Sequence, residues 1–167
     1  MKYFSKIVIL ILITTILNSC GAAVKSVANN HLTEEKGAIP PNFGANNTTL
    51  VFITYRKSYN KYLKKNVKKY YTGEHEFVTN EEFNRDKKYK NLDKYRYVFD
   101  YKSVSPGYEV VTSDGFRRSP LFNVRKFTVE DRKKHETYKS DMTSSYWSKI
   151  QKVYISKLNE KRLDNQS

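Results

Sequence analysis

The sequence predicts a single small α+β domain, in which a mixed β-sheet is packed by an N-terminal basic amphipathic helix and by a C-terminal helix. Three observations support this fold class. A short apolar run at residues 50–53 is typical of a strand that is covered on both faces. Helical periodicity follows over residues 57–71 and returns over residues 143–161, and the chain between them alternates as strands do. The length of 167 residues fits one domain.

The first strand and the first helix form one unit. Over residues 57–71, apolar side chains recur every three or four positions while lysines occupy the opposite face, which predicts an amphipathic helix that Gly73 ends. A short strand is expected over residues 74–78. Thr79 and Glu82 then match a capping box, which predicts the start of another short helix.

The second half of the chain is expected to be rich in strands. Residues 95–101 alternate between aromatic and other side chains, which predicts a strand. Turn residues at 113–115 and at 131–134 each predict a hairpin. The closing helix over residues 143–161 carries an apolar stripe that includes Trp147 and is expected to pack on the sheet.

The N-terminus has the order of an export signal. Lys2 and Lys6 precede an apolar run over residues 7–17, and small or polar residues lead to Cys20. A membrane-spanning helix needs about 20 apolar residues, and this run is much shorter. An export signal is therefore predicted in preference to a spanning anchor.

The end of this segment resembles the lipobox of bacterial lipoproteins. It reads Leu17-Asn18-Ser19-Cys20-Gly21, in which Asn18 is more polar than usual, a relaxed pattern similar to that of Bacteroidota lipoproteins. The resemblance, which covers only the first 21 residues, implies cleavage before Cys20, a diacylglycerol on its thiol and a third acyl chain on its new amino group. Two or more acyl chains anchor a protein stably. An uncleaved anchor and soluble secretion are the alternatives.

The resemblance also implies an address in the cell envelope. Gly21 is not the Asp that retains enterobacterial lipoproteins in the inner membrane, and no acidic cluster for surface export follows Cys20. Together these features imply an outer-membrane lipoprotein that faces the periplasm.

The chain accordingly divides into four parts. Residues 1–19 are the predicted signal peptide, and residues 20–47 are expected to form a flexible tether from the lipidated Cys20, because they show no sustained period. Ile39 and Phe43 are expected to pack at the end of this tether. Residues 48–163 form the folded domain, and residues 164–167 form a C-terminal tail.

The strongly basic composition limits the choice of partners. The net charge is +14, and loss of Lys2 and Lys6 with the signal leaves +12. In the cytoplasm, nucleic acid would be the first candidate, but export largely removes it. Anionic lipid, lipopolysaccharide, acidic glycan or an acidic envelope protein remain. A solvated surface without any ligand is the alternative, because AT-rich coding sequence favours lysine.

One helix face is the candidate anionic-ligand surface. It consists of the row Lys57, Lys61, Lys64, Lys65 and Lys68. Lys87, Lys88 and residues 132–134 are candidates to extend this row.

No catalytic, metal or cofactor site is predicted. The motifs HExxH, GxSxG, GxGxxG and the P-loop are absent, and a single cysteine excludes an internal disulfide. Glu74-His75-Glu76 is the nearest approach to a ligand cluster, but alternate residues of a strand point to opposite faces. His31 and His135 have no predicted partner.

Two functions are compatible with these features. The first is a non-enzymatic, membrane-anchored binding or accessory module that contacts anionic envelope components through the lysine row. The second is a small envelope enzyme that acts on glycan or peptide. The binding module is favoured because it needs nothing that the sequence lacks.

Overall fold

The computed structural model describes residues 24–104, 110–111, 117–118, 124–140 and 146–167. Its five-stranded sheet has the order β2-β1-β3-β6-β7. The strands are β1 (Leu50–Thr54), β2 (His75–Thr79), β3 (Tyr97–Val104), β6 (Val124–Asp131) and β7 (Glu136–Lys139). β1 is parallel to β2 and to β3, whereas β6 is antiparallel to β3 and to β7. The predicted α+β class with a mixed sheet is confirmed.

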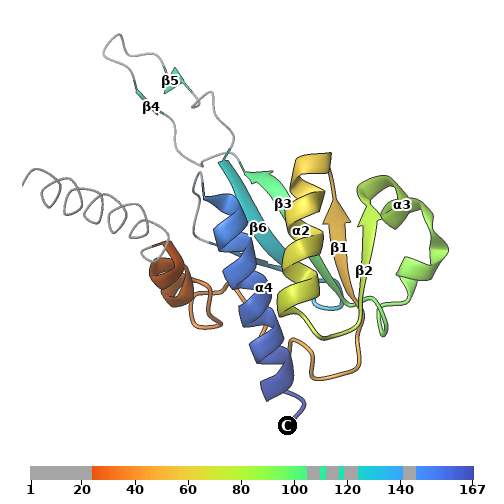
Figure 1. Cartoon of the computed structure of the whole chain (residues 1–167). Helices are drawn as coiled ribbons and strands as arrows, with labels where there is room; N and C mark the ends of the chain where they lie inside the picture. The colour runs from red at the N-terminus through yellow and green to blue at the C-terminus, as the bar shows by residue number, and fades with distance from the viewer. Residues whose placement is uncertain (1–23, 105–109, 112–116, 119–123, 141–145) are drawn as a thin grey trace, which may run out of the picture.

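Two helices cover one face of the sheet (Figure 1). α2 (Lys57–Tyr70) connects the parallel strands β1 and β2, and α4 (Trp147–Asp164) packs beside it. The two helices run parallel, because Tyr59 contacts Trp147 near their starts and Thr72, just after α2, donates a hydrogen bond to Asn159 farther along α4. The predicted basic amphipathic helix and C-terminal helix are therefore both present.

Gly73 does not end α2 as the sequence analysis expected. The helix ends at Tyr70, and Tyr71 leaves it in an extended conformation. The lack of a side chain at Gly73 matters for packing instead, since a Cβ there would lie 2.8 Å from the Arg162 side chain of α4.

The apolar run of β1 is covered on both faces, as expected. Leu50 and Phe52 join the core beneath α2 and α4. Val51 and Ile53 join a second cluster on the opposite face, where α3 (Asn80–Arg85) and the 3₁₀ helix η1 (Lys87–Lys90) pack. The predicted capping box begins α3, with Thr79 as its N-cap.

Both predicted hairpins are present as strand pairs. β4 (Val110–Val111) pairs antiparallel with β5 (Arg117–Arg118), and their turn lies outside the described residues. β6 and β7 pair across the polar turn, where His135 adopts a φ of 55°. The first residues of the predicted closing helix, 143–145, also lie outside the described residues, and α4 runs from Trp147 to Asp164.

The segment predicted as a flexible tether is largely part of the folded core. Residues 24–31 are helical, and Ala28, Leu32, Ala38, Ile39 and Phe43 are each at most 4% exposed. The tether prediction for residues 20–47 is therefore wrong for residues 28–43, although Ile39 and Phe43 pack as expected. Scattered apolar residues without a period gave no local signal, because partners of this segment, such as Tyr97 of β3 and Tyr154 of α4, lie more than 50 positions away.

Polar contacts fix the same segment. The Tyr97 hydroxyl donates to the Asn42 carbonyl at 2.9 Å, and the Tyr154 hydroxyl donates to the Ala38 carbonyl. The predicted C-terminal tail is docked here as well, because the Asn165 side-chain amide donates to the Phe43 carbonyl at 2.8 Å.

Candidate anion-binding surface

The predicted lysine row lies on the exposed face of α2. Tyr59, Leu63, Asn66 and Val67 are buried against the core, so the opposite face is left to solvent. Six lysines and no acidic residue occur in this helix. Those of the row, all exposed, are Lys57, Lys61, Lys64, Lys65 and Lys68.

These lysines are not neutralised by the rest of the described chain. None of the five forms an ion pair with another described residue. Lys64 Nζ lies 5.6 Å from the centre of the Phe77 ring, on the side of β2. Lys65 lies on the other side of the row and lines a groove beside α4. The row therefore divides between two flanks of α2.

The groove between α2 and α4 gathers four lysines from two helices. Its volume is about 250 Å³, and Tyr62, Asn66, Tyr70 and Ser148 contribute to its lining. We call the four cations that line it the groove lysines: Lys65, Lys69, Lys149 and Lys152. Sequence reasoning included only Lys65, because about 80 positions separate the two helical pairs. The polar positions of the closing helix, which include Lys149 and Lys152, were the one sequence feature that could have indicated the second pair of lysines.

The two helices meet beneath the groove through a polar contact. The Asn66 side-chain amide is buried and donates to the Gln151 amide oxygen at 2.8 Å and to the Ser148 carbonyl at 3.3 Å. This contact fixes the relative positions of the helices. The groove lysines are consequently carried on two helices that contact each other directly beneath the groove.

Tyr70 reports the electrostatic character of this groove. Lys152 Nζ lies 4.9 Å and Lys69 Nζ lies 5.5 Å from the centre of its ring. Hydrogen bonding and charge from Lys152, with a smaller contribution from Lys69, hold the pKa of Tyr70 below its usual value. A negatively charged oxygen is thus favoured at this position.

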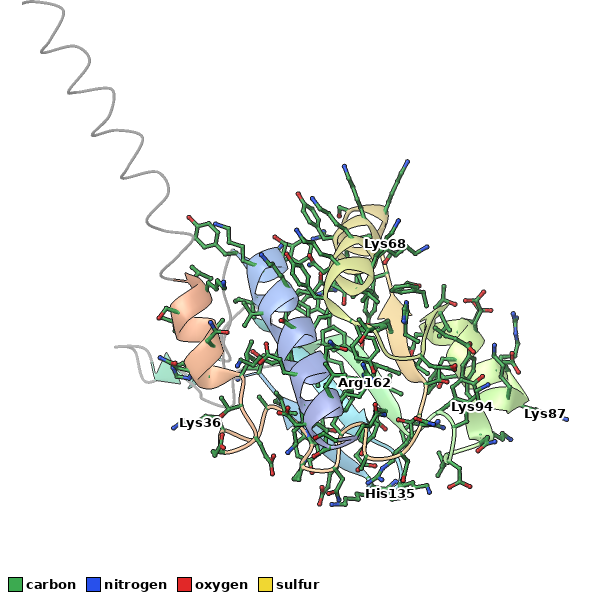
Figure 2. All side chains as sticks on the ribbon, turned by 60° about the horizontal axis from the view of Figure 1, so that its bottom comes forward. Lys36, Lys68, Lys87, Lys94, His135 and Arg162 are labelled. Atoms are coloured by element: carbon green, nitrogen blue, oxygen red, sulfur yellow. The ribbon has the colours of Figure 1, made fainter. Side chains whose placement is uncertain are left out.

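The other cations that sequence reasoning added to the row are mostly paired. Lys88 forms a 2.9 Å ion pair with Glu76, and Lys133 pairs with Asp93. Arg132 donates to the carbonyls of Tyr89 and Tyr95 at 2.6 and 2.7 Å. These residues belong to the region around η1 and the β6–β7 turn, and Lys87 also lies on that side of the molecule, far from residues 24–31 (Figure 2). They do not extend the surface of α2.

Glu74-His75-Glu76 does not form a site. His75 packs against the rings of Phe52, Tyr71 and Phe77 on the helix-covered face. Glu76 lies on the opposite face and accepts hydrogen bonds from Lys88, Tyr89 and Tyr95, all at 2.9 Å. Within the described parts of the chain, no group of three His, Cys, Asp or Glu side chains could hold a metal ion.

A buried carboxylate lies near the carboxyl end of β1, and sequence reasoning did not single it out. Asp100 is 5% exposed and accepts hydrogen bonds from the Tyr55 hydroxyl and, at 2.7 Å, from the Tyr101 amide. Burial, together with the hydrogen bond to Asp100, raises the pKa of Tyr55. A tyrosine held neutral donates to this carboxylate, so the pair fits a structural role.

The comparisons with protein-family models, curated proteins and solved structures gave no match to this chain. In the portion of the chain that the structure describes, no helix has the length and apolarity needed to cross a membrane. Cys20 and the rest of the predicted signal lie outside that portion.

Proposed function

We propose that the protein is a cell-envelope lipoprotein, anchored through acyl chains on Cys20 to the outer membrane and facing the periplasm. In this proposal it is a non-enzymatic binding or accessory module, and its basic surface contacts anionic envelope components. The signal order and the lipobox resemblance around Cys20 support the anchor. The exposed lysines of α2 support the binding surface.

One observation carries the binding role. The lysine row of α2 is exposed and lacks an ion-pair partner among the described residues, and the helix has no acidic residue of its own. Like charges held three or four positions apart on a helix repel one another. An anionic partner would relieve this repulsion, so the row is better suited to binding an anion than to stabilising the fold.

An envelope enzyme acting on glycan or peptide is the less supported alternative. Its best candidate cluster was Glu74-His75-Glu76. His75 and Glu76 are directed to opposite faces of the sheet by contacts that already engage both side chains.

Metabolic labelling with a fatty-acid probe tests the anchor. Cells expressing the native chain or the Cys20→Ala variant are labelled, and the intact mass of each purified protein is measured. We expect label and a mass corresponding to cleavage before Cys20 in the native protein, and neither in the variant. An unlabelled native protein of full mass would contradict the proposal.

Charge reversal tests the binding surface. We expect Lys61→Glu, Lys64→Glu and Lys68→Glu together to weaken retention on lipopolysaccharide or on phosphatidylglycerol vesicles, and added salt to weaken retention of the native protein. The matched control reverses three exposed lysines of the η1 region, Lys87, Lys90 and Lys94. Equal retention of both variants and the native chain would remove the lysine row as the site.

A further inference from the structure

We infer that the anchored domain lies directly on the headgroups of its own membrane leaflet, with the groove lysines and the helical residues 24–31 facing anionic phospholipids. This inference rests on the proposed lipidation of Cys20. It specifies the partner as phosphate-bearing lipid headgroups and replaces a freely swinging domain with one that has a fixed orientation.

The predicted anchor at Cys20 lies only a short distance along the chain from the folded core. Val24 packs against the main hydrophobic core, and Ala28 and Leu32 are fully buried. Only three residues separate Cys20 from Val24, so the four Cα–Cα steps of this link span at most about 14 Å even when fully extended. An anchor at Cys20 therefore holds this side of the domain close to the membrane surface.

The side of the domain that carries residues 24–31 is basic. Residues 24–31 lie beside α4, and α2 lies on the other side of α4 (Figure 1). A groove of about 520 Å³ between the 24–31 helix and α4 is lined by Lys25, Tyr70 and Lys152, among others. Tyr70 and Lys152 also line the groove between α2 and α4. The two grooves are thus adjacent, with Tyr70 and Lys152 lining both, so the groove lysines lie next to the groove at the anchored end.

The cations of this face are free to bind anionic headgroups. Lys25 and the groove lysines form no ion pair with another described residue. Three of the groove lysines lie over tyrosine rings, such as Lys149 Nζ at 4.8 Å from the centre of the Tyr146 ring. Tyr62 and Tyr146 are 45% and 42% exposed beside them. Lysine and tyrosine side chains together suit the interface between lipid and water, where an apolar body and a polar tip are both accommodated.

The acyl anchor strengthens the weak affinity of the lysines for anionic headgroups. Each lysine near an anionic membrane contributes a modest attraction that salt screens. The acyl chains confine the domain to the surface, so these attractions act at a high effective concentration. The anchor supplies residence on the membrane, and the lysines supply orientation.

Lysine footprinting on vesicles tests the inference with the mature, lipidated protein. The protein is reconstituted into phosphatidylcholine vesicles with or without about 30% phosphatidylglycerol, and the acetylation rate of each lysine is measured by mass spectrometry. We expect Lys25 and the groove lysines to react at least about fivefold more slowly on the anionic vesicles, and about 1 M salt to abolish this difference. Lys87 and Lys94 lie on the opposite side from residues 24–31 (Figure 2) and should react equally on both vesicles.

The outcomes separate this inference from the proposed function. A protein that does not remain with neutral vesicles lacks the acyl anchor, which would defeat both proposals. A protein that remains but shows equal rates on both vesicles keeps the anchor and overturns the orientation. Stronger protection of Lys87 and Lys94 than of the groove lysines would overturn it as well.

A pair of variants with equal charge completes the test. One variant replaces all four groove lysines with Ser, and the other replaces four lysines of the distant side. These are Lys87, Lys90, Lys94 and Lys134. We expect Lys25 to lose its protection on anionic vesicles only in the first variant, with cooperative thermal unfolding showing that both remain folded. Equal loss in both variants would mean that net charge, rather than this face, drives the contact.

Discussion

Two basic regions of this molecule differ in what surrounds their cations. Around η1 and the β6–β7 turn, each of four cations faces an acidic side chain or backbone carbonyls. We call these the paired cations: Lys88, Arg96, Arg132 and Lys133. The groove lysines between α2 and α4 face tyrosine rings and solvent instead. A count of positive charges does not distinguish the paired cations from the groove lysines, whereas the presence of acidic or carbonyl partners does.

Burial explains why the paired cations belong to the fold. The Arg96 and Asp131 side chains are 12% and 2% exposed, and two hydrogen bonds of 2.8 and 2.6 Å join them. Burial opposes ionisation of Asp131, but the Arg96 guanidinium, helped by the backbone N–H groups of Lys133 and Lys134, more than offsets this effect and holds the pKa of Asp131 below its usual value. A buried carboxylate needs such a partner, whereas an exposed lysine does not.

The largest expected effect on stability comes from breaking the buried pair of Arg96 and Asp131. Arg96→Ala leaves Asp131 charged and without its partner, and we expect a loss of about 3–5 kcal/mol in the free energy of unfolding. Urea denaturation followed by circular dichroism measures it. Lys68→Ala on α2 is the control and should change stability by less than about 0.5 kcal/mol. Equal losses in the two variants would contradict the comparison.

The second effect depends on pH. Burial raises the pKa of Glu76, but hydrogen bonds from Lys88, Tyr95 and Tyr89 more than offset this and bring it below 4.5. Such a group stabilises the fold above its unfolded pKa, and this contribution is lost as pH falls through the folded value. We expect Glu76→Gln to cost about 1–2 kcal/mol at pH 7.

Denaturation of both proteins from pH 7 to pH 3 measures this dependence. The difference between native protein and Glu76→Gln should shrink as the native carboxylate becomes protonated, because both side chains are then neutral. A difference that stays constant over this range would show that Glu76 acts through shape rather than charge.

The third substitution is expected to stabilise the protein, whereas the first two destabilise it. Lys65→Glu places an acidic residue four positions from both Lys61 and Lys69, so it should stabilise the protein by about 0.5–1 kcal/mol at low ionic strength. The matched control, Arg85→Glu, removes the 3.2 Å pair with Glu81 and should destabilise. Thermal unfolding at low salt and at about 1 M salt measures both, and screening should reduce both changes. A destabilising Lys65→Glu would indicate an unrecognised structural role for Lys65.

The smallest effect is a change in one pKa. Lys152→Met keeps most of the side chain but removes the charge that holds the pKa of Tyr70 down, so that pKa should rise toward 10. Nuclear magnetic resonance titration of a ¹³C-labelled tyrosine carbon follows it, and Lys87→Met serves as the control. An unchanged pKa of Tyr70 would mean that the groove lysines do not act together.

Much of the fold could be predicted because its signals are local. Apolar periodicity located α2 and α4, and the capping box at Thr79 located the start of α3. Each signal depends on neighbours within four positions. The candidate site was predicted only in part. The lysine row lies on one helix and has a local pattern, whereas the groove lysines come from two helices that are distant in the chain.

The sequence by itself determined the α+β class, the basic face of α2 and the lipobox-like residue pattern around Cys20, because each depends on the order of nearby residues. Only the tertiary structure decided that residues 28–43 pack in the core, that Lys149 and Lys152 lie beside Lys65 and Lys69, and that Lys88 and Arg132 are paired. These facts depend on contacts between residues that are distant in the chain. Periodicity carries no information about such contacts, so the three-dimensional packing alone separates cations that hold the fold together from cations that can bind a partner.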